Sequence, residues 1–112
     1  ASLHSSLTRE RSAVRVLGDP AARHVPVSGA RGQLVVAPSG DAVLAVALPA
    51  PPSGKTYEAW IANGTVQRAG EFDGRTLVVH GHVAHGAKVL VTLERAGGVD
   101  APTSQPLLSA RA

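Results

Sequence analysis

Short segments that predict strands recur along most of the chain, and turn-forming residues separate them about every 8 to 12 positions. The clearest case is segment 87–94, in which apolar and polar residues alternate: Ala87, Val89, Val91 and Leu93 fall on one face, and Lys88, Thr92 and Glu94 fall on the other, with Leu90 between them. Residues at every second position share one face of a strand. We therefore expect a strand with one face on a core and the other largely in water.

Further strands are expected on either side of short turns. Asn63-Gly64 tolerates the positive φ that a type I′ turn requires, so it predicts a hairpin between two apolar segments. Pro26 restricts its own segment to the edge of a sheet. The expected strands cover residues 23–27, 33–37, 42–48, 55–62, 65–72, 75–80, 87–94 and 105–109. This spacing predicts an all-β fold, an antiparallel β-sandwich that is immunoglobulin-like and has seven to eight short strands.

The first 12 residues lack this alternation. They are rich in Ser and Arg, and only Leu3 and Leu7 are large and apolar. The spacing of these two leucines would place both on one face of a helix. We predict a short N-terminal stalk, frayed or helical, over residues 1–12 and the sandwich domain over residues 13–112.

The composition agrees with one small β domain. The chain has 112 residues, with 12 glycines and 8 prolines for its turns, and only 3% aromatic residues. Its core must therefore consist mainly of Val, Leu, Ala and Ile. The absence of Cys excludes disulfides, thiol catalysis and Cys-ligated zinc. Because Met is absent even at the first position, we expect a fragment or a processed product. No apolar run approaches the roughly 20 residues that span a bilayer, so we expect any anchor to lie outside this segment.

Charge and motifs argue against nucleic-acid binding and catalysis. The net charge is +3 and the pI is about 10.2, but the arginines are dispersed and few aromatics are present for stacking on bases. Ser53-Gly54-Lys55-Thr56 is similar to the end of a phosphate-binding loop, yet Pro49 stands where that loop needs its first glycine. No serine lies in a Gly-x-Ser-x-Gly motif. The acidic residues of the strands, Glu58, Glu71 and Glu94, are expected on an exposed sheet face. We expect no enzyme, no nucleic-acid partner and no cofactor.

Three of the five histidines lie close together, at His80, His82 and His85. If residues 76–82 are extended, His80 and His82 share one face, a spacing that can bind zinc or copper. Gly81 and Gly86 instead indicate a flexible hairpin tip, and no carboxylate within the run could orient an imidazole. We favour solvated histidines in a surface loop and keep a metal site as the alternative.

Two of the three aromatic side chains, Tyr57 and Trp60, lie in one expected strand. Their separation of three residues places them on opposite faces. Either ring could be exposed and bind a ligand or a partner. We favour packed rings whose polar atoms are bonded to neighbouring groups.

Taken as one pattern, residues 13–110 resemble the C-terminal domain of the anti-sigma-K factor family. The matching pieces are residues 16–17, 19–20, 38–44, 48–49, 52–61, 69–72, 91–98 and 101–103. The chain departs from the common pattern at Ala59-Trp60, where Leu-Trp is expected, and in its histidine-rich stretch. Structural roles are expected for Tyr57, Trp60, Gly70, Phe72, Gly97, Gly98 and Pro102.

The resemblance implies a parent protein with three parts. A cytoplasmic domain, absent here, would bind an extracytoplasmic-function sigma factor, one transmembrane helix would follow, and this chain would lie on the outer side, with residues 1–12 next to the membrane. Site-1-type and intramembrane proteases would then release the sigma factor in response to a signal. The alternative is a secreted or anchored β-sandwich module that binds a ligand or a metal.

Overall fold

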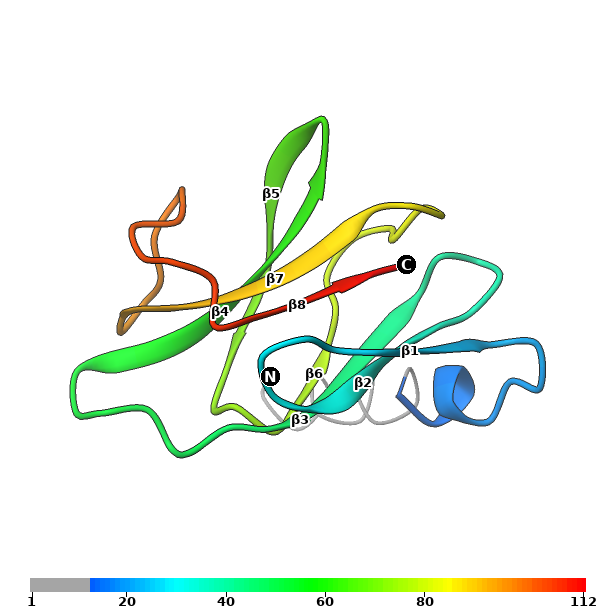
Figure 1. Cartoon of the computed structure of the whole chain (residues 1–112), viewed down its shortest axis with the longest axis horizontal. Helices are drawn as coiled ribbons and strands as arrows, with labels where there is room; N and C mark the ends of the chain where they lie inside the picture. Colours follow the sequence, from blue (N-terminus) through cyan, green and yellow to red (C-terminus); the bar gives the residue numbers. More distant parts are fainter. Residues whose placement is uncertain (1–12) are drawn as a thin grey trace, which may run out of the picture.

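The computed structural model describes residues 13–112, which form two four-stranded antiparallel sheets (Figure 1). The first sheet has the order β1-β2-β3-β6 and the second the order β5-β4-β7-β8. The strands are β1 Arg23–Pro26, β2 Arg31–Val36, β3 Ala42–Ala47, β4 Lys55–Asn63, β5 Thr65–Phe72, β6 Thr76–Val78, β7 Lys88–Arg95 and β8 Leu108–Arg111. The predicted β-sandwich is confirmed. The predicted stalk, residues 1–12, lies outside the described residues.

The core lies between the inner faces of the two sheets. The first sheet contributes its even-numbered apolar residues, such as Leu34 and Leu44, which pair across β2 and β3. The second contributes small and medium side chains, such as Ala59, Val89 and Val91, all with no exposed surface. Because aromatics are scarce, aliphatic side chains fill most of this layer, as the composition predicts.

The alternation places a second, smaller apolar cluster on the outer face of the first sheet. Val35 and Val43 pair across β2 and β3 and point away from the main core. A helical turn at residues 13–17 covers them, and its Val16 is only 3% exposed. Both faces of this sheet are therefore packed, and residues 13–17 are part of the folded domain.

Seven of the eight strands differ from their predicted bounds by at least one residue, and for β6 and β8 the structure shows the cause. The segment expected at 75–80 is a strand only over β6. The Val79 amide still donates to Ala42 of β3, at 2.9 Å, but the next amide, that of His80, donates to Ala69 of β5, at 2.9 Å. The segment expected at 105–109 begins only at Leu108, since the residues before it cross the outer face of the second sheet. The expected edge position of residues 23–27 is confirmed, because β1 pairs with β2 alone among the strands.

The two sheets are joined along one side. Ser28, just after β1, exchanges two backbone hydrogen bonds with Ser109 of β8, at 2.8 and 3.0 Å. By contrast, the turn between β4 and β5 projects from the sandwich (Figure 1), and residues 63–68 are exposed. Loops that follow different strands lie together at two places in this fold. One is at an end of the sandwich, and the other is on the outer face of the second sheet.

Candidate functional site

The three histidines of the β6–β7 loop point to different places. His80 lines a hollow beside Gly70 and Glu71 of β5, whereas His82 and His85 line a cleft on the side of the β2–β3 turn. The prediction that His80 and His82 share one face is wrong, because the strand ends at Val78 and Gly81, with φ of 107°, turns the backbone between them. In residues 13–112 no three His, Cys, Asp or Glu side chains are grouped so that they could hold a metal ion. That these histidines do not bind zinc tightly stays a prediction.

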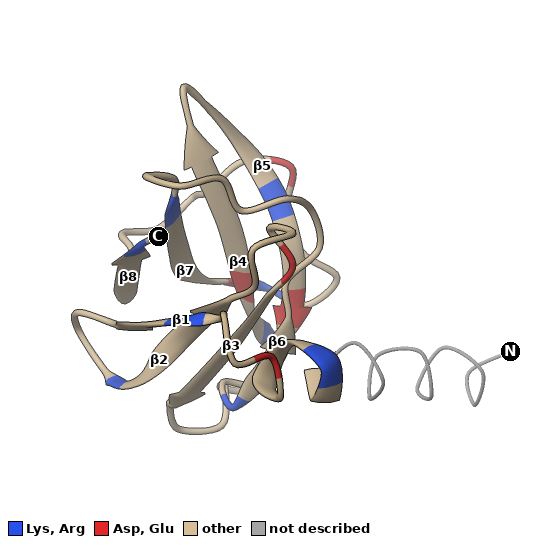
Figure 2. Cartoon of the chain, turned by 90° about the vertical axis from the view of Figure 1, so that its right-hand side faces the viewer, with Lys and Arg blue, Asp and Glu red and all other residues tan. Residues whose placement is uncertain are grey.

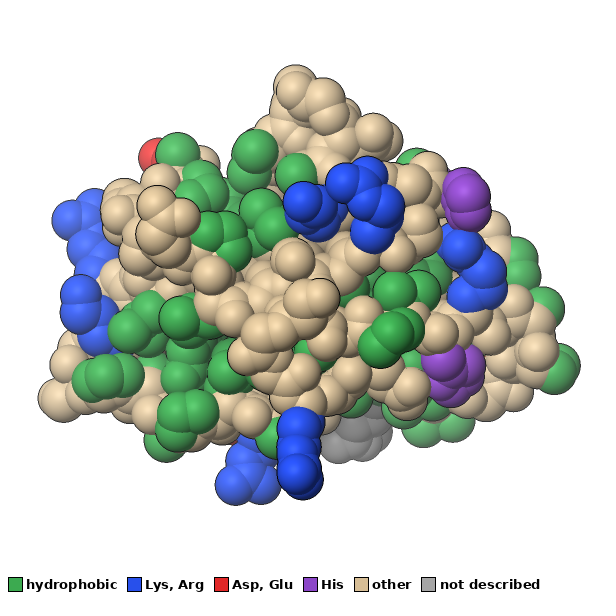
Figure 3. All heavy atoms as spheres, in the orientation of Figure 1, with side chains coloured by type: hydrophobic (Ala, Val, Ile, Leu, Met, Phe, Trp, Pro, Cys, Tyr) green, Lys and Arg blue, Asp and Glu red, His purple; other side chains and the backbone are tan. Residues whose placement is uncertain are grey.

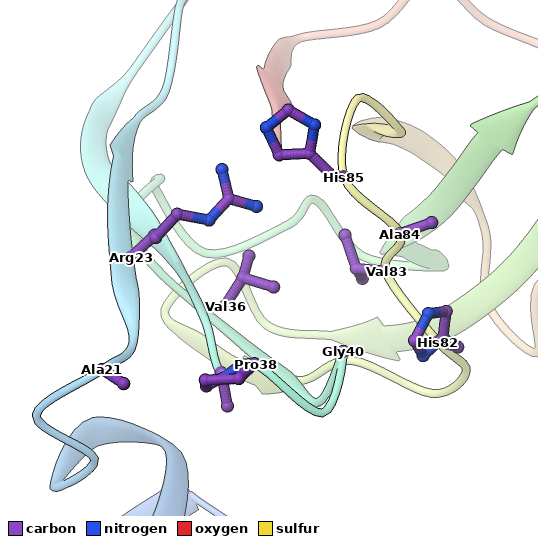
Figure 4. A pocket seen from close by; sticks show the side chains of 10 residues that line it. Ala21, Arg23, Val36, Pro38, Gly40, His82, Val83, Ala84 and His85 are labelled. Atoms are coloured by element: carbon purple, nitrogen blue, oxygen red, sulfur yellow. The ribbon is translucent and has the colours of Figure 1, made fainter.

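The cleft with His82 and His85 lies at the end of the sandwich and has a volume of about 370 Å³. Arg23 of β1 forms one wall and His85 of the β6–β7 loop forms the other, while Val36 and Val83 lie between them (Figure 4). The amide of Val83 donates to the carbonyl of Gly40 at 2.9 Å, which fixes the loop on the β2–β3 turn.

Gly40 shapes one wall of this cleft. A Cβ atom at this position would lie 2.0 Å from Nδ1 of His82, so only glycine lets the imidazole lie against the turn. Its φ of 92° is also a conformation that favours glycine. The exposed His82 ring therefore lies against Gly40 in the wall. The sequence carries no sign of this contact.

Tyr57 lies between the sheets and is 4% exposed. Its hydroxyl donates to the carbonyl of Pro49 at 2.8 Å, and its ring centre lies 6.1 Å from that of Phe72. The ring spans from the main core to the β3–β4 loop. Its polar atom is bonded to backbone, and almost none of its surface is available to a ligand.

Trp60 is completely buried but lies on the other face of β4. It is not part of the core between the sheets, and it pairs with Leu90 across β7, next to the pair formed by Glu58 and Thr92. Its indole N–H donates to the Thr92 hydroxyl at 2.9 Å. The structure thus places both rings away from solvent and on opposite faces of the strand.

The outer face of the second sheet carries three buried polar residues, Glu58, Thr92 and Glu94, and the exposed Arg68 lies over them. We call these four residues the outer polar layer. Glu58 has no exposed surface and accepts hydrogen bonds from Nε of Arg68, at 2.8 Å, and from the amide of Val99, at 2.9 Å. Arg68 also lies 3.3 Å from Asp100. Hydrogen bonding and charge interaction with Glu58 raise the pKa of the Arg68 guanidinium.

Glu94 of β7 also belongs to the outer polar layer and is 1% exposed. It accepts hydrogen bonds from the amide and hydroxyl of Thr103, and Ser104 donates to the carbonyl of Leu93 at 2.8 Å. Burial raises the pKa of Glu94, but the hydrogen bonds from Thr103 and Thr92 outweigh it, so the pKa lies below the usual range of a glutamate. The carboxylate is held ionised in a nearly dry position.

The expectation that Glu58 and Glu94 face solvent is therefore wrong, whereas Glu71 is exposed as expected. The cause is the segment of residues 96–107, which we call the covering loop; it runs over the second sheet (orange, Figure 1). Gly98 lies so close that a Cβ atom would be 2.6 Å from the Arg68 guanidinium. The predicted structural residues Gly97, Gly98 and Pro102 all belong to this loop, and Gly70 and Phe72 lie in β5.

Charged side chains are dispersed over the domain. Lys and Arg residues occur on most elements without forming a continuous strip (Figure 2). Acidic residues are interspersed with them, and the described ion pairs all involve Arg68. In the part of the chain that the structure describes, no helix is long and apolar enough to cross a membrane.

Comparison with known proteins identifies the family. Residues 1–107 match the family described as anti-sigma-K factor rskA, C-terminal. A Streptomyces griseus protein named for the phr 5′ region is 36% identical, and the match covers 70% of this chain but 36% of the relative's own length. No solved structure matches. The β-sandwich described above is therefore a member of the family of anti-sigma-K factor C-terminal domains.

Proposed function

We propose that this chain is the extracytoplasmic regulatory domain of a membrane-anchored anti-sigma factor. The observation that carries the proposal is the family match over residues 1–107. The family is a regulatory one, which agrees with a domain that acts without catalysis. The chain spans 36% of the length of its relative, and this supports a parent protein with room for a separate sigma-binding domain and an anchor.

In this proposal the folded sandwich controls access of proteases. A cytoplasmic domain of the parent binds an extracytoplasmic-function sigma factor, and a signal outside the membrane leads to cleavage there and then within the membrane. A protease needs a segment whose backbone groups are accessible, and pairing within the two sheets occupies those groups in the strands. Stability of the sandwich thus keeps the sigma factor bound in the absence of a signal.

The location can be tested by labelling a single cysteine. The chain has no Cys, so Asn63→Cys, in the exposed turn between β4 and β5, introduces one thiol into this domain of the full-length parent, with any cysteine elsewhere in the parent replaced. A membrane-impermeant maleimide should label it in intact cells. Labelling only after lysis would contradict an outer location.

The regulatory role is tested separately with a reporter gene that depends on the cognate sigma factor. Deleting residues 13–112 from the parent should change reporter activity in response to envelope stress. A parent without this domain that represses and responds as the wild type does would refute the regulatory role, whatever the labelling result.

A further inference from the structure

The cleft at the end of the sandwich has hydrogen-bond donors on both sides of its mouth. The Arg23 guanidinium and the His85 imidazole extend over the opening from β1 and from the β6–β7 loop (Figure 4). A guanidinium is always charged and has five N–H donors and no acceptor, and an imidazole offers at least one N–H in either protonation state. The mouth therefore suits a ligand group that accepts hydrogen bonds and carries negative charge.

Acidic side chains do not occupy this mouth within residues 13–112. The described ion pairs belong to Arg68 on the second sheet, and Arg23 takes part in none of them. Asp41, in the turn next to the cleft, accepts a hydrogen bond from the Ser39 hydroxyl at 3.2 Å. On the face shown in Figure 3, histidine and basic side chains lie together at the right-hand side, other basic side chains lie at the left edge and at the bottom, and the acidic side chain in view lies at the upper left. The local charge thus favours an anion.

The inside of the cleft is apolar and fixed in shape. Pro38 and Ala84 line it with apolar surface that is open to a ligand, over Val36 and Val83, which are only 3% and 2% exposed. The hydrogen bond from the Val83 amide to the Gly40 carbonyl and the close contact between Gly40 and His82 hold the β6–β7 loop against the β2–β3 turn. A volume of about 370 Å³ is enough for a short aliphatic chain.

We propose that this cleft binds a small aliphatic carboxylate. The carboxylate lies between Arg23 and His85, where the planar guanidinium can donate two parallel hydrogen bonds. The aliphatic chain lies on Pro38 and Ala84. This binding site is additional to the proposed regulatory function and does not depend on it.

The test is an NMR titration of the ¹⁵N-labelled 112-residue chain with hexanoate. Saturable shifts are expected in the amides of residues 37–41 and 82–86. Acetate keeps the charge without the chain, and 1-hexanol keeps the chain without the charge. Each should bind at least about threefold more weakly than hexanoate, because each lacks one of the two contacts.

Variants assign the binding to the proposed contacts. Arg23→Gln should weaken hexanoate binding by about three- to tenfold, and His85→Gln should weaken it less. Arg31→Gln is the matched control, because it removes the same charge at the other end of β2 and should leave the affinity unchanged. If Arg23→Gln disturbs the spectrum outside the cleft, Arg23→Lys replaces it and should give an intermediate affinity.

Three results would overturn the proposal. Shifts that do not saturate would indicate no site. Equal weakening by Arg23→Gln and Arg31→Gln would indicate only the overall positive charge. Wild-type affinity in both Arg23→Gln and His85→Gln would show that the mouth does not bind the carboxylate.

Discussion

Truncation of Trp60 to alanine should destabilise the domain severely. The indole ring has no exposed surface and makes a 2.9 Å hydrogen bond to Thr92. Removing a buried aromatic side chain costs about 3–5 kcal/mol, and a domain of this size has a total unfolding free energy of about 5–15 kcal/mol. The variant should therefore lose at least a fifth of its stability, and most of it if the wild type is at the lower limit.

The assay is urea unfolding followed by circular dichroism, since Trp60 is the single tryptophan and its fluorescence is lost in the variant. Tyr57→Ala, in the main core, should cost a similar amount. Val66→Ala is the control, because Val66 is 51% exposed and should change the unfolding free energy by less than about 0.5 kcal/mol. A Trp60→Ala cost below about 1 kcal/mol would refute the reasoning and would leave the outer face of the second sheet without a structural role for the ring.

Three further results are expected. Glu94 has a lowered pKa, so its stabilising contribution is complete above pH about 4.5 and is lost as the pH falls through the pKa of the folded state. The urea midpoint of Glu94→Gln should therefore depend less on acid pH than that of the wild type. Equal pH dependence of the two midpoints would contradict this. Calorimetry should find no submicromolar zinc or copper site; one that His80→Ala and His82→Ala abolish would support the metal-binding alternative. The isolated chain should not retain the cognate sigma factor in a pull-down, and micromolar binding would show that the sigma-binding surface lies within it.

Strand positions could be predicted wherever local patterns determine them. The alternation in residues 87–94 and the Asn63-Gly64 turn depend on a few neighbouring residues, and β7 and the β4–β5 hairpin lie where they indicate. The short strands β6 and β8 were less well placed, because their ends are fixed by contacts with distant segments. His80, for example, bonds to Ala69 and so leaves the line of β6.

The sites could not be predicted from the sequence because distant segments build them. Glu58 and Glu94 lie in their strands as exposed side chains would. The covering loop that buries them consists mostly of small and polar residues, whose pattern does not indicate that the loop packs on a sheet. The cleft joins β1, the β2–β3 turn and the β6–β7 loop. The large apolar ring of Trp60, on the same face of β4 as Glu58, was the one local hint that the outer face is not open to water.

The edges of the two sheets affect how copies of this domain behave when they are concentrated. An unpaired edge strand can pair with an edge of another molecule and begin aggregation. Here β1 ends in Pro26, which has no amide to donate, and β6 and β8 have three and four residues. The longest edge, β5, is interrupted by an irregularity opposite Ala59 and Trp60, and the His80 amide occupies its Ala69 carbonyl. We therefore expect the domain to stay free of edge-to-edge association at high protein concentration.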